Sequence, residues 1–349
     1  MSLVSVHNEW DPLEEVIVGT TVGARVPLGD RSMMSIEFPD VDSPDDIPSG
    51  PYDPRAVEEA QVELDALAES LQALGIVVRR PQPRDHSVVG SSPHWSTDSF
   101  PDVCPRDGFL TVGDTVIETP MSLRSRFFEY LAYKDLFIEY LRSGSRWISA
   151  PKPRLADDLF DPAAPVGRRV RDDEPTFDAA NVLRIGTDLL YLVSDSGSEL
   201  GLRWLQSTLG SQYTVHPVRD VYASTHIDTT FVPLRPGLVL LNSTRVTEVN
   251  LPKVFRGWDL IWAEEPVDTH PPDRRPNGSV WVGMNLLSIS PDLVVADERQ
   301  TSLVKQLEAH GIDVLPARLT HSRTFGGGFH CVTLDVRRRG TLETYTCAT

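Results

Sequence analysis

Pairs of short apolar runs, joined by turn residues, recur along the hydrophobic pattern of this 349-residue chain. Each pair has the form of a β-hairpin, because its halves have strand length and residues typical of turns stand at its tip. The pairs are FLTVGDTVIE, VLRIGTDLLYLV, FVPLRPGLVLL and LSISPDLVVAD. A further short apolar strand is predicted at residues 14–19 (EEVIVG).

A second pattern, in which a helix leads through a glycine into a strand, accompanies these units. Apolar residues mark one helical face, Gly75 stands where a C-cap is expected, and residues 76–78 form a strand. The residues of that face are Ala60, Leu64, Leu67, Leu71 and Leu74. The same order recurs at LRSGSRWI, LQSTLGSQYTV, VFRGWDLIW and LEAHGIDVL. The sequence therefore predicts five ββαβ-like units.

The spacing of the five units favours a closed ring. Their intervals vary over roughly 45–70 residues, which disfavours a solenoid, because the period of a solenoid is fixed. Five units instead suggest closure around a pseudo-fivefold axis, with a last strand at 331–337 beside the strand at 14–19. We therefore predict an α/β fold in a single domain over residues 1–349, with loop insertions near 20–55 and 151–175.

Composition limits the classes of function. A formal net charge of −17 argues against nucleic acid as a partner, and the carboxylates could attract a cationic small molecule. The N-terminus carries no targeting segment, and no apolar run approaches the ~18 residues that a membrane span needs. Cys104, Cys331 and Cys347 are too few and too scattered for a disulfide framework or a zinc ribbon. We expect a cytoplasmic protein that acts on small molecules.

Polar residues occur at equivalent places in different units, and in a closed ring they would meet in one central pocket. They are PRD at 105–107, FDAAN at 177–181, HID at 226–228, GMN at 283–285 and GFHC at 328–331. The last block begins with the third glycine of a triplet at 326–328. Glycine in such a position usually serves a positive φ or a close approach of the backbone to another group. Cys331 is therefore a candidate nucleophile, with an inert buried thiol as the alternative.

Strand alternation sets the expected roles of the two histidines near these blocks. His226 and Asp228 are two residues apart and point to the same face of a strand, which makes His226 the candidate acid–base group. Alternation places His330 and Cys331 on opposite faces, so His330 is expected to be structural. Zinc is an alternative for Cys331 and His226, but no C-x2-C or H-x3-H spacing occurs, and no metal is expected.

A cysteine, a histidine and several carboxylates suit chemistry on a guanidinium group. Guanidinium is planar and permanently cationic, so a buried one needs paired carboxylates, which Asp107, Asp178 and Asp228 could supply. A thiolate could attack the central carbon, with its pKa lowered by the bound cation or by a protonated histidine. His226 would protonate the leaving amine.

Long blocks of the chain closely resemble the arginine amidinotransferases. The blocks are EPTFDAAN, HIDTTF, PRDGFLTVG, SRFFEYLAYKDL and GGGFHCVTLDVRRRGTLETY, and the likeness runs from about Asn8 to Tyr345. The resemblance implies the pentein fold, a five-bladed α/β propeller of ββαβ modules, which agrees with the repeats above. It also implies a homodimer and a reaction without a cofactor.

The resemblance further implies roles for individual residues. Cys331, His226 and Asp178 match the catalytic triad of the family, and Asp107 and Asp228 match the carboxylates that hold the guanidinium. Two more matches concern the substrates: Arg245 corresponds to the arginine that binds the α-carboxylate of the donor, and Ser279 to one of two adjacent serines in the glycine-specific branch.

Two departures from the glycine-specific branch bear on the acceptor. Gly278 replaces the second serine, and Ala-Ser-Thr at 223–225 replaces Asn-Pro-Met before the histidine. Smaller residues should open the site to an acceptor larger than glycine. The bacterial branch with a large acceptor transfers the amidino group to scyllo-inosamine 4-phosphate in the biosynthesis of streptomycin-type antibiotics, and this is the expected reaction. The candidate partners for the phosphate are Arg124, Arg126, Arg274 and Arg275.

Three other functions stay open at this stage. Glycine could be the acceptor, or water could resolve the covalent adduct, as in an arginine deiminase or a dimethylarginine hydrolase. A catalytically inert propeller that serves as a binding module is the third alternative. Citrulline as product would indicate a hydrolase, and ornithine with a new guanidine would indicate a transferase.

Overall fold

Small sheets of three strands build the computed structural model, which describes residues 2–272 and 275–345. In each sheet an antiparallel pair is extended by a third strand that runs parallel to the middle one. Over the described residues, five such sheets confirm the predicted ββαβ units. The sheets are β19–β1–β4 (Thr333–Arg338, Leu13–Val18, Val77–Arg79), β7–β8–β9 (Phe109–Val112, Thr115–Glu118, Arg146–Ser149), β10–β11–β12 (Val182–Ile185, Asp188–Leu192, Thr214–Val218), β13–β14–β15 (Phe231–Arg235, Leu238–Asn242, Asp259–Ala263) and β16–β17–β18 (Leu287–Ser290, Leu293–Asp297, Asp313–Ala317).

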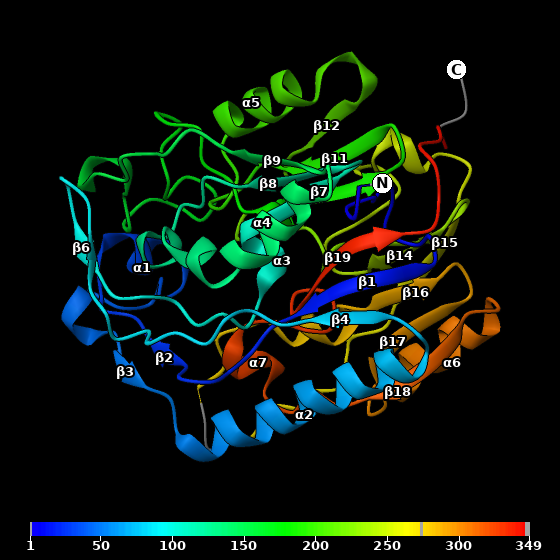
Figure 1. Ribbon diagram of the computed structural model, residues 1–349, viewed down its shortest axis with the longest axis horizontal. Helices are drawn as coiled ribbons and strands as arrows, with labels where there is room; N and C mark the ends of the chain where they lie inside the picture. The colour runs from blue at the N-terminus through cyan, green and yellow to red at the C-terminus, as the bar shows by residue number, and fades with distance from the viewer. Residues whose placement is uncertain (1, 273–274, 346–349) are drawn as a thin grey trace.

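Each parallel strand is entered through a glycine with positive φ, which explains the recurring helix–glycine–strand order. The glycines have φ between 69° and 98°, a region that favours glycine because it has no Cβ. They are Gly75, Gly144, Gly210, Gly257 and Gly311. Four of the preceding helices are α2 (Pro54–Ala73), α4 (Lys134–Arg142), α5 (Glu199–Leu209) and α6 (Thr301–Ala309). Figure 1 shows α5 at the top, α2 at the bottom and α6 at the right edge of the molecule.

Two details of the predicted helices are wrong. The segment VFRGWDLIW holds only a 3-10 turn, η7 (Lys253–Phe255), before β15. Leu74, predicted on the buried face of α2, is 48% exposed, because the helix ends at Ala73 and Leu74 is its C-cap. The other four residues of that face are buried, as predicted.

The closing strand pairs with the first strand, as predicted. β19 runs antiparallel to β1, with Thr333 opposite Val18, and Figure 1 shows the red arrow beside the blue one. The strand begins at Thr333 and not at Cys331, which corrects the predicted bounds. Cys331 and Val332 lie in a turn, where the N–H of Val332 donates to the oxygen of Gly328 at 3.0 Å.

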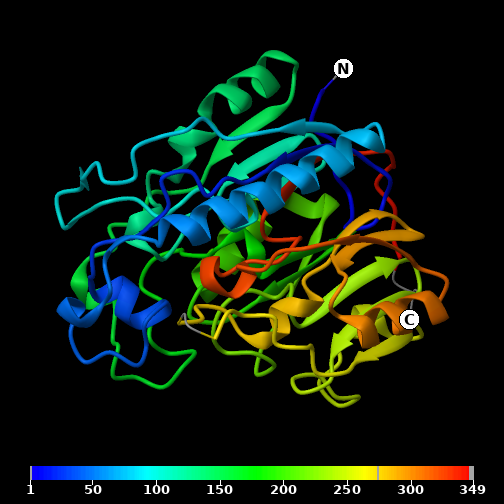
Figure 2. The same ribbon diagram turned by 90° about the horizontal axis from the view of Figure 1, so that it is seen from below.

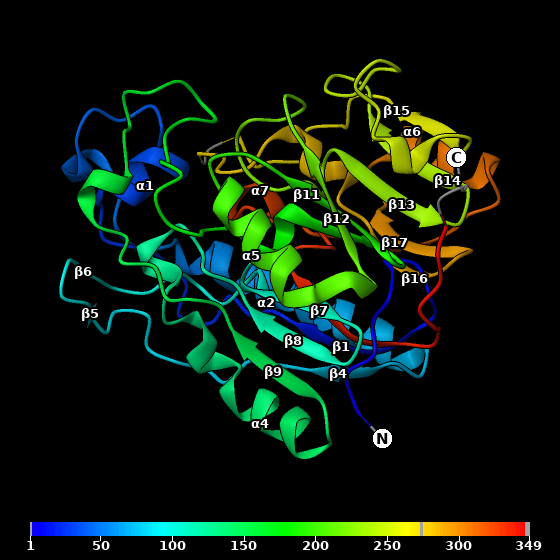
Figure 3. The same cartoon turned by 90° about the horizontal axis from the view of Figure 1, so that it is seen from above.

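Two long segments between the strands contact each other beside the sheets. Residues 20–55 hold β2 (Arg25–Val26), α1 (Arg31–Ile36), η1 (Pro44–Asp46) and β3 (Gly50–Pro51), and residues 151–175 hold η4 (Asp157–Leu159). Arg31 donates to the backbone oxygen of Phe160 at 3.2 Å. The two segments lie side by side at the left in Figures 1, 2 and 3. Their description as insertions into one domain stays a prediction.

Further short elements connect the sheets. They are β5 (Gly90–Ser91), β6 (Ser96–Thr97), α3 (Pro105–Gly108), α7 (Ser322–Phe325), η2 (Arg124–Arg126), η3 (Glu129–Ala132), η5 (Ala179–Asn181), η6 (Gly210–Gln212) and η8 (Val280–Met284). Over the described residues, none of the helices combines the length and the apolar character that crossing a membrane requires.

A buried network of charges joins the closing strand to other parts of the chain. Asp335 on β19 pairs with the guanidinium groups of Arg106, Arg184 and Arg338 at 2.7, 3.0 and 2.6 Å. Arg184 also forms a two-point pair with Glu9, at 2.8 and 2.7 Å. Burial alone would raise the pKa of Asp335, but the three arginines hold it well below its usual range. Arg106 and Arg184 come from other parts of the chain, so their pairs with Asp335 form only when the ring is closed.

Asp335→Asn should lower the free energy of unfolding by about 3–5 kcal/mol, because three buried guanidinium groups lose a shared anionic acceptor. Urea titration followed by circular dichroism measures this loss. Glu298→Gln is the control, since it breaks an exposed pair with Arg318 that is worth less than about 1 kcal/mol. Equal effects of the two substitutions would contradict the stabilising role of the network.

Candidate active site

A cavity of about 450 Å³ is lined by segments that are far apart in the sequence. Its wall comes from residues 36–40, α3, residues 222–229, residues 275–282 and the turn before β19. Five of the seven residues predicted for the site line it, namely Asp107, His226, Asp228, Ser279 and Cys331. The other two, Asp178 and Arg245, each contact a lining residue.

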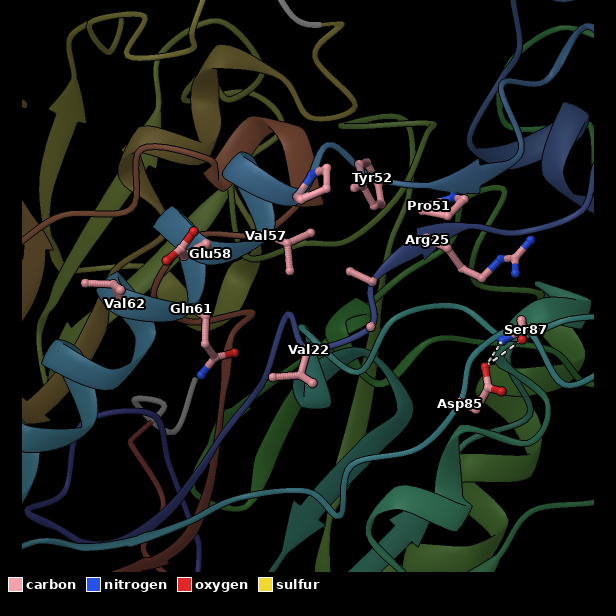
Figure 4. Close-up of a pocket in the computed structure, with 13 residues that line it drawn as sticks. Val22, Arg25, Pro51, Tyr52, Val57, Glu58, Gln61, Val62, Asp85 and Ser87 are labelled. Carbon is pink, nitrogen blue, oxygen red and sulfur yellow. Dashed lines mark hydrogen bonds between the residues drawn. The ribbon is translucent and has the colours of Figure 1, made fainter.

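A second hollow, of about 550 Å³, lies against the N-terminal half of α2 and holds none of the predicted residues. Figure 4 shows Val22, Val57 and Val62 around it, with hydrogen bonds between Asp85 and Ser87. Its lining contains neither a cysteine nor a histidine. The groups that could carry chemistry therefore gather at the first cavity.

His226 lies between two aspartates. Its Nε2 is 3.0 Å from Oδ2 of Asp178, and its Nδ1 is 3.8 Å from Oδ1 of Asp107. Burial lowers the pKa of His226, but Asp107 and the hydrogen bond with Asp178 outweigh burial and raise it to about 9. The ring is thus an imidazolium near neutral pH, the form that can give a proton to a leaving amine.

The backbone at His226 corrects the prediction that it shares a strand with Asp228. Residues 226–230 lie in no strand, with a bend at Ile227 and a turn at 228–230, and His226 has a φ of 59°, which is unusual for a residue with a Cβ. The N–H of Ile227 donates to the oxygen of Ala180 at 3.0 Å and holds the turn against η5. This strained turn, and not strand alternation, brings both side chains to the cavity.

Asp228 contacts both residues that alternation had placed on opposite faces. Its Oδ2 accepts from Nδ1 of His330 at 2.8 Å and from Sγ of Cys331 at 3.3 Å. Alternation does not apply, because both residues lie in the turn before β19. Burial would raise the pKa of Asp228, but His330 lowers it to about 2. Since Nε2 of His330 is 3.3 Å from Glu9, this histidine ties the site to the buried charge network.

The glycine triplet shapes the turn that presents Cys331. Gly326 has a φ of 78°, and a Cβ on Gly328 would lie 2.7 Å from the Cβ of Asn285. That close approach lets Oδ1 of Asn285 accept from the backbone N–H groups of His330 and Cys331, at 3.0 and 3.1 Å. Both expected uses of the triplet, positive φ and close approach, therefore occur.

Three buried carboxylate oxygens at the site have no hydrogen-bond partner among the described residues. They are the Oδ1 atoms of Asp107, Asp178 and Asp228. Buried acceptors without a partner are rare, and a set of three calls for a ligand with several donors. A guanidinium group has five N–H donors and a permanent positive charge, so it matches this set.

Two of these carboxylates, those of Asp107 and Asp228, oppose ionisation of Cys331. Burial, Asp228 and Asp107 raise the pKa of Cys331 well above its usual value. The imidazolium of His226 does not offset them. Of the two causes of activation expected from the sequence, only a bound cation is left to make the thiolate favourable.

Arg245 and Ser279 reach the cavity to different degrees. The guanidinium of Arg245 lies 3.6 Å from the ring centroid of Tyr222, a lining residue. Its Nη1 donates to the hydroxyls of Thr229 and Thr230, at 2.9 and 3.0 Å. Ser279 lines the cavity directly, at the start of η8.

The two departures from the glycine-specific branch both lie at the cavity. Ser224 and Thr225 line it, next to His226. Gly278 also lines it, and a Cβ there would meet nothing closer than 3.7 Å. A serine would therefore fit at this position, so its absence leaves more room in the cavity and is not forced by the backbone.

Two of the four arginines proposed for a phosphate already form ion pairs with carboxylates of the protein. Arg124 is buried and pairs with Asp157 at 2.6 Å. Arg126 is buried and pairs with Asp107 and Glu129, each at 2.6 Å. Arg274 lies outside the described residues, as does Cys347. Arg275 lines the cavity and is exposed.

Sequence reasoning missed Glu37, which lines the cavity from the end of α1. No motif marks it, because it lies in a loop segment that only the tertiary structure brings to the site. Among the described residues, no group of three or more histidine, cysteine, aspartate or glutamate side chains is arranged to hold a metal ion.

The chain is 63% identical to inosamine-phosphate amidinotransferase 1 of Streptomyces glaucescens over 346 residues, which are 99% of each chain. Its structure matches that of inosamine-phosphate amidinotransferase from Streptomyces griseus with a TM-score of 0.98 and 63% identity, over 99% of this chain and 100% of that one. It is 37% identical to mitochondrial glycine amidinotransferase of Danio rerio, over 98% of this chain and 84% of the relative. No protein-family model matches the chain. The predicted pentein fold is confirmed.

Asp228→Asn should have two effects of opposite sign. It should weaken arginine binding by about 2–4 kcal/mol, because the guanidinium loses a charged acceptor. It should also speed alkylation of Cys331 by iodoacetamide, because a charge that raises the pKa of Cys331 is removed. Calorimetry and peptide mass spectrometry measure the two effects, with Asp65→Asn on α2 as the control. An unchanged dissociation constant for arginine would remove this carboxylate from the guanidinium site.

Proposed function

The chain belongs to the amidinotransferase family, and we propose that it transfers the amidino group of L-arginine to scyllo-inosamine 4-phosphate and releases L-ornithine. The reaction would serve the biosynthesis of streptomycin-type aminocyclitol antibiotics. The observation that carries the proposal is the set of three unpartnered carboxylate oxygens on aspartates that contact His226 or Cys331. It occurs in a chain whose relatives at 63% identity are named for the inosamine phosphate.

In the first half-reaction, Asp107 and Asp228 hold the guanidinium of arginine, whose charge offsets the carboxylates around Cys331. The Cys331 thiolate attacks the central carbon, and the bond from that carbon to the ornithine nitrogen breaks. His226, protonated beside Asp178, gives its proton to the leaving nitrogen. Ornithine departs, and a cationic amidino group stays on the sulfur.

In the second half-reaction, the neutral amine of the acceptor attacks the amidino carbon. The carbon–sulfur bond breaks, Cys331 leaves as a thiolate, and His226 takes the proton that the new guanidine nitrogen loses. The same histidine thus acts as acid and then as base. The thiolate–imidazolium pair of the arginine complex is restored, and the thiol proton that left to solvent when arginine bound returns after product release.

We assign the α-carboxylate of the donor to Arg245, and we propose Ser279, which lines the cavity, as a further substrate-binding residue. Arg245 is held by Tyr222 and by two threonine hydroxyls at the wall of the cavity, so its cation is fixed before the substrate arrives. A guanidinium fork offers a carboxylate two parallel hydrogen bonds. We further propose that the protein acts in the cytoplasm as a homodimer, as the sequence resemblance implies.

The acceptor proposal rests on the size of the cavity and on the identities above. Gly278 and residues 223–225 leave room beside His226 that an acceptor as small as glycine does not need. The lower identity to glycine amidinotransferase points the same way. A hydrolase is disfavoured because the relatives that match the whole chain at 63% identity are named as transferases.

Cys331→Ser should lower transfer by more than about 1000-fold, because a hydroxyl cannot replace the thiolate as nucleophile. Intact-mass spectrometry after incubation with arginine should show an amidino adduct on the native protein and none on the variant. Cys104→Ala, which removes a neighbouring buried thiol, should keep the adduct. Residual turnover within tenfold of the native rate would remove Cys331 from the mechanism.

At saturating arginine, inosamine phosphate should be a better acceptor than unphosphorylated inosamine by at least about tenfold in kcat/KM, since one charge-assisted contact is worth about 1.5–3 kcal/mol. Glycine should be poorer than both. Ornithine release and the new guanidine product are measured together. Glycine as the best acceptor would establish the alternative reaction, and citrulline as the main product would establish a hydrolase.

A further inference from the structure

Glu37 and Arg275 are charged groups at the cavity that the reaction above does not use. Both line it, Glu37 from the C-terminal end of α1 and Arg275 from the segment before η8. The backbone N–H of Glu37 donates to the oxygen of Met33 at 2.9 Å, so the end of the helix fixes its backbone. Within the described part of the chain, its carboxylate has no hydrogen bond or ion pair.

Glu37 lies close enough to the catalytic groups to respond to their charges. The pKa of Glu37 is raised, mainly by burial, because the opposing effect of His226 and Arg126 does not outweigh burial and the charges of Asp178 and Asp107. Glu37 is thus a further carboxylate facing the same cavity as Cys331. The three aspartates already match the donor guanidinium, which leaves Glu37 for a different cation.

Arg275 places a positive charge at the same cavity, next to the segment that carries Glu37. Its guanidinium lies 4.9 Å from the ring centroid of Phe38, the residue after Glu37. Phe38 is buried in a cluster with Met33 and Ile36, so it forms a fixed platform under an exposed cation. Among the described residues, no carboxylate is paired with Arg275, although the exposed Asp40 also lines the cavity.

We propose that Glu37 and Arg275 form the acceptor subsite, in which Glu37 holds the amino group of the acceptor and Arg275 holds its phosphate. This inference rests on the proposed function. The two side chains carry opposite charges, and both line the same cavity. They therefore orient an acceptor that has an amine at one end and a phosphate at the other. A free amino acid such as glycine has no group for Arg275 beyond its carboxylate.

Glu37 also supplies the base that the second half-reaction requires. An aminocyclitol amine arrives as an ammonium group, which has no lone pair for attack. The ammonium gives one proton to the carboxylate of Glu37 and becomes a neutral amine. The amine then attacks the amidino carbon, the carbon–sulfur bond breaks, and the second proton goes to His226. Charge and protons balance, with Glu37 returning its proton to water after product release.

The test separates the two half-reactions. Glu37→Gln should form the amidino adduct on Cys331 from arginine within about twofold of the native rate, which also shows that the variant folds. Its kcat/KM for inosamine phosphate should fall at least tenfold at pH 7, and the deficit should shrink as the pH rises and the free acceptor loses its proton. Glu69→Gln, at an exposed glutamate on α2 away from the cavity, is the matched control and should change neither step. Glu37→Asp should restore part of the loss.

Arg275→Ala should lower kcat/KM for inosamine phosphate at least tenfold and leave the value for unphosphorylated inosamine unchanged. Arg203→Ala, an exposed arginine on α5, is the matched control. Equal losses with both acceptors would overturn the assignment of the phosphate to Arg275. A slower adduct with Glu37→Gln would place Glu37 at the donor, and no change in either step would remove it from the site. Absence of any adduct on the native protein would instead contradict the proposed function itself.

Discussion

The buried charge of Asp335 is the constraint on which the rest of the structure depends. It lies on the strand that closes the ring, and three arginines converge on it. An open ring would deprive Arg106 and Arg184 of Asp335 as a partner, and losing one partner of a buried ion pair costs about 3–5 kcal/mol. The network continues from Glu9 through His330 to Asp228, which contacts the thiol of Cys331. Closure of the fold and the position of the nucleophile therefore depend on one continuous set of contacts.

In the proposed reaction, the excess of carboxylates at the site couples binding of arginine to activation of Cys331. Asp107 and Asp228 keep Cys331 protonated by raising its pKa, and they also supply the open acceptors for a guanidinium. We propose that a bound guanidinium cancels the repulsion that disfavours the thiolate, so that the reactive form arises only with the donor in place. The proposed acceptor subsite uses a different part of the chain, since Glu37 comes from a segment outside the five sheets.

Local patterns predicted the fold well, because its repeats are short. Each hairpin is encoded within about ten residues, and each entry into a parallel strand requires a glycine at positive φ, as at Gly75 and Gly311. The helix before Gly257 was overpredicted, because a few apolar residues before a glycine are compatible with either a helix or a 3-10 turn. The start of the closing strand was misplaced for a similar reason, since an alternating pattern cannot show where the hydrogen bonds of a turn end.

The sequence by itself determined the five repeats, the chemical types at the site and the family resemblance, because these depend on residue identity and short spacing. Only the tertiary structure decided how the side chains meet. Asp228 contacts both His330 and Cys331 through turns that strand alternation does not describe. Arg126 proved to be the buried partner of Asp107, and Glu37 reached the cavity from a segment without a motif. Contacts of this kind join residues that are distant in the chain, so their geometry is set by the packing of the closed ring.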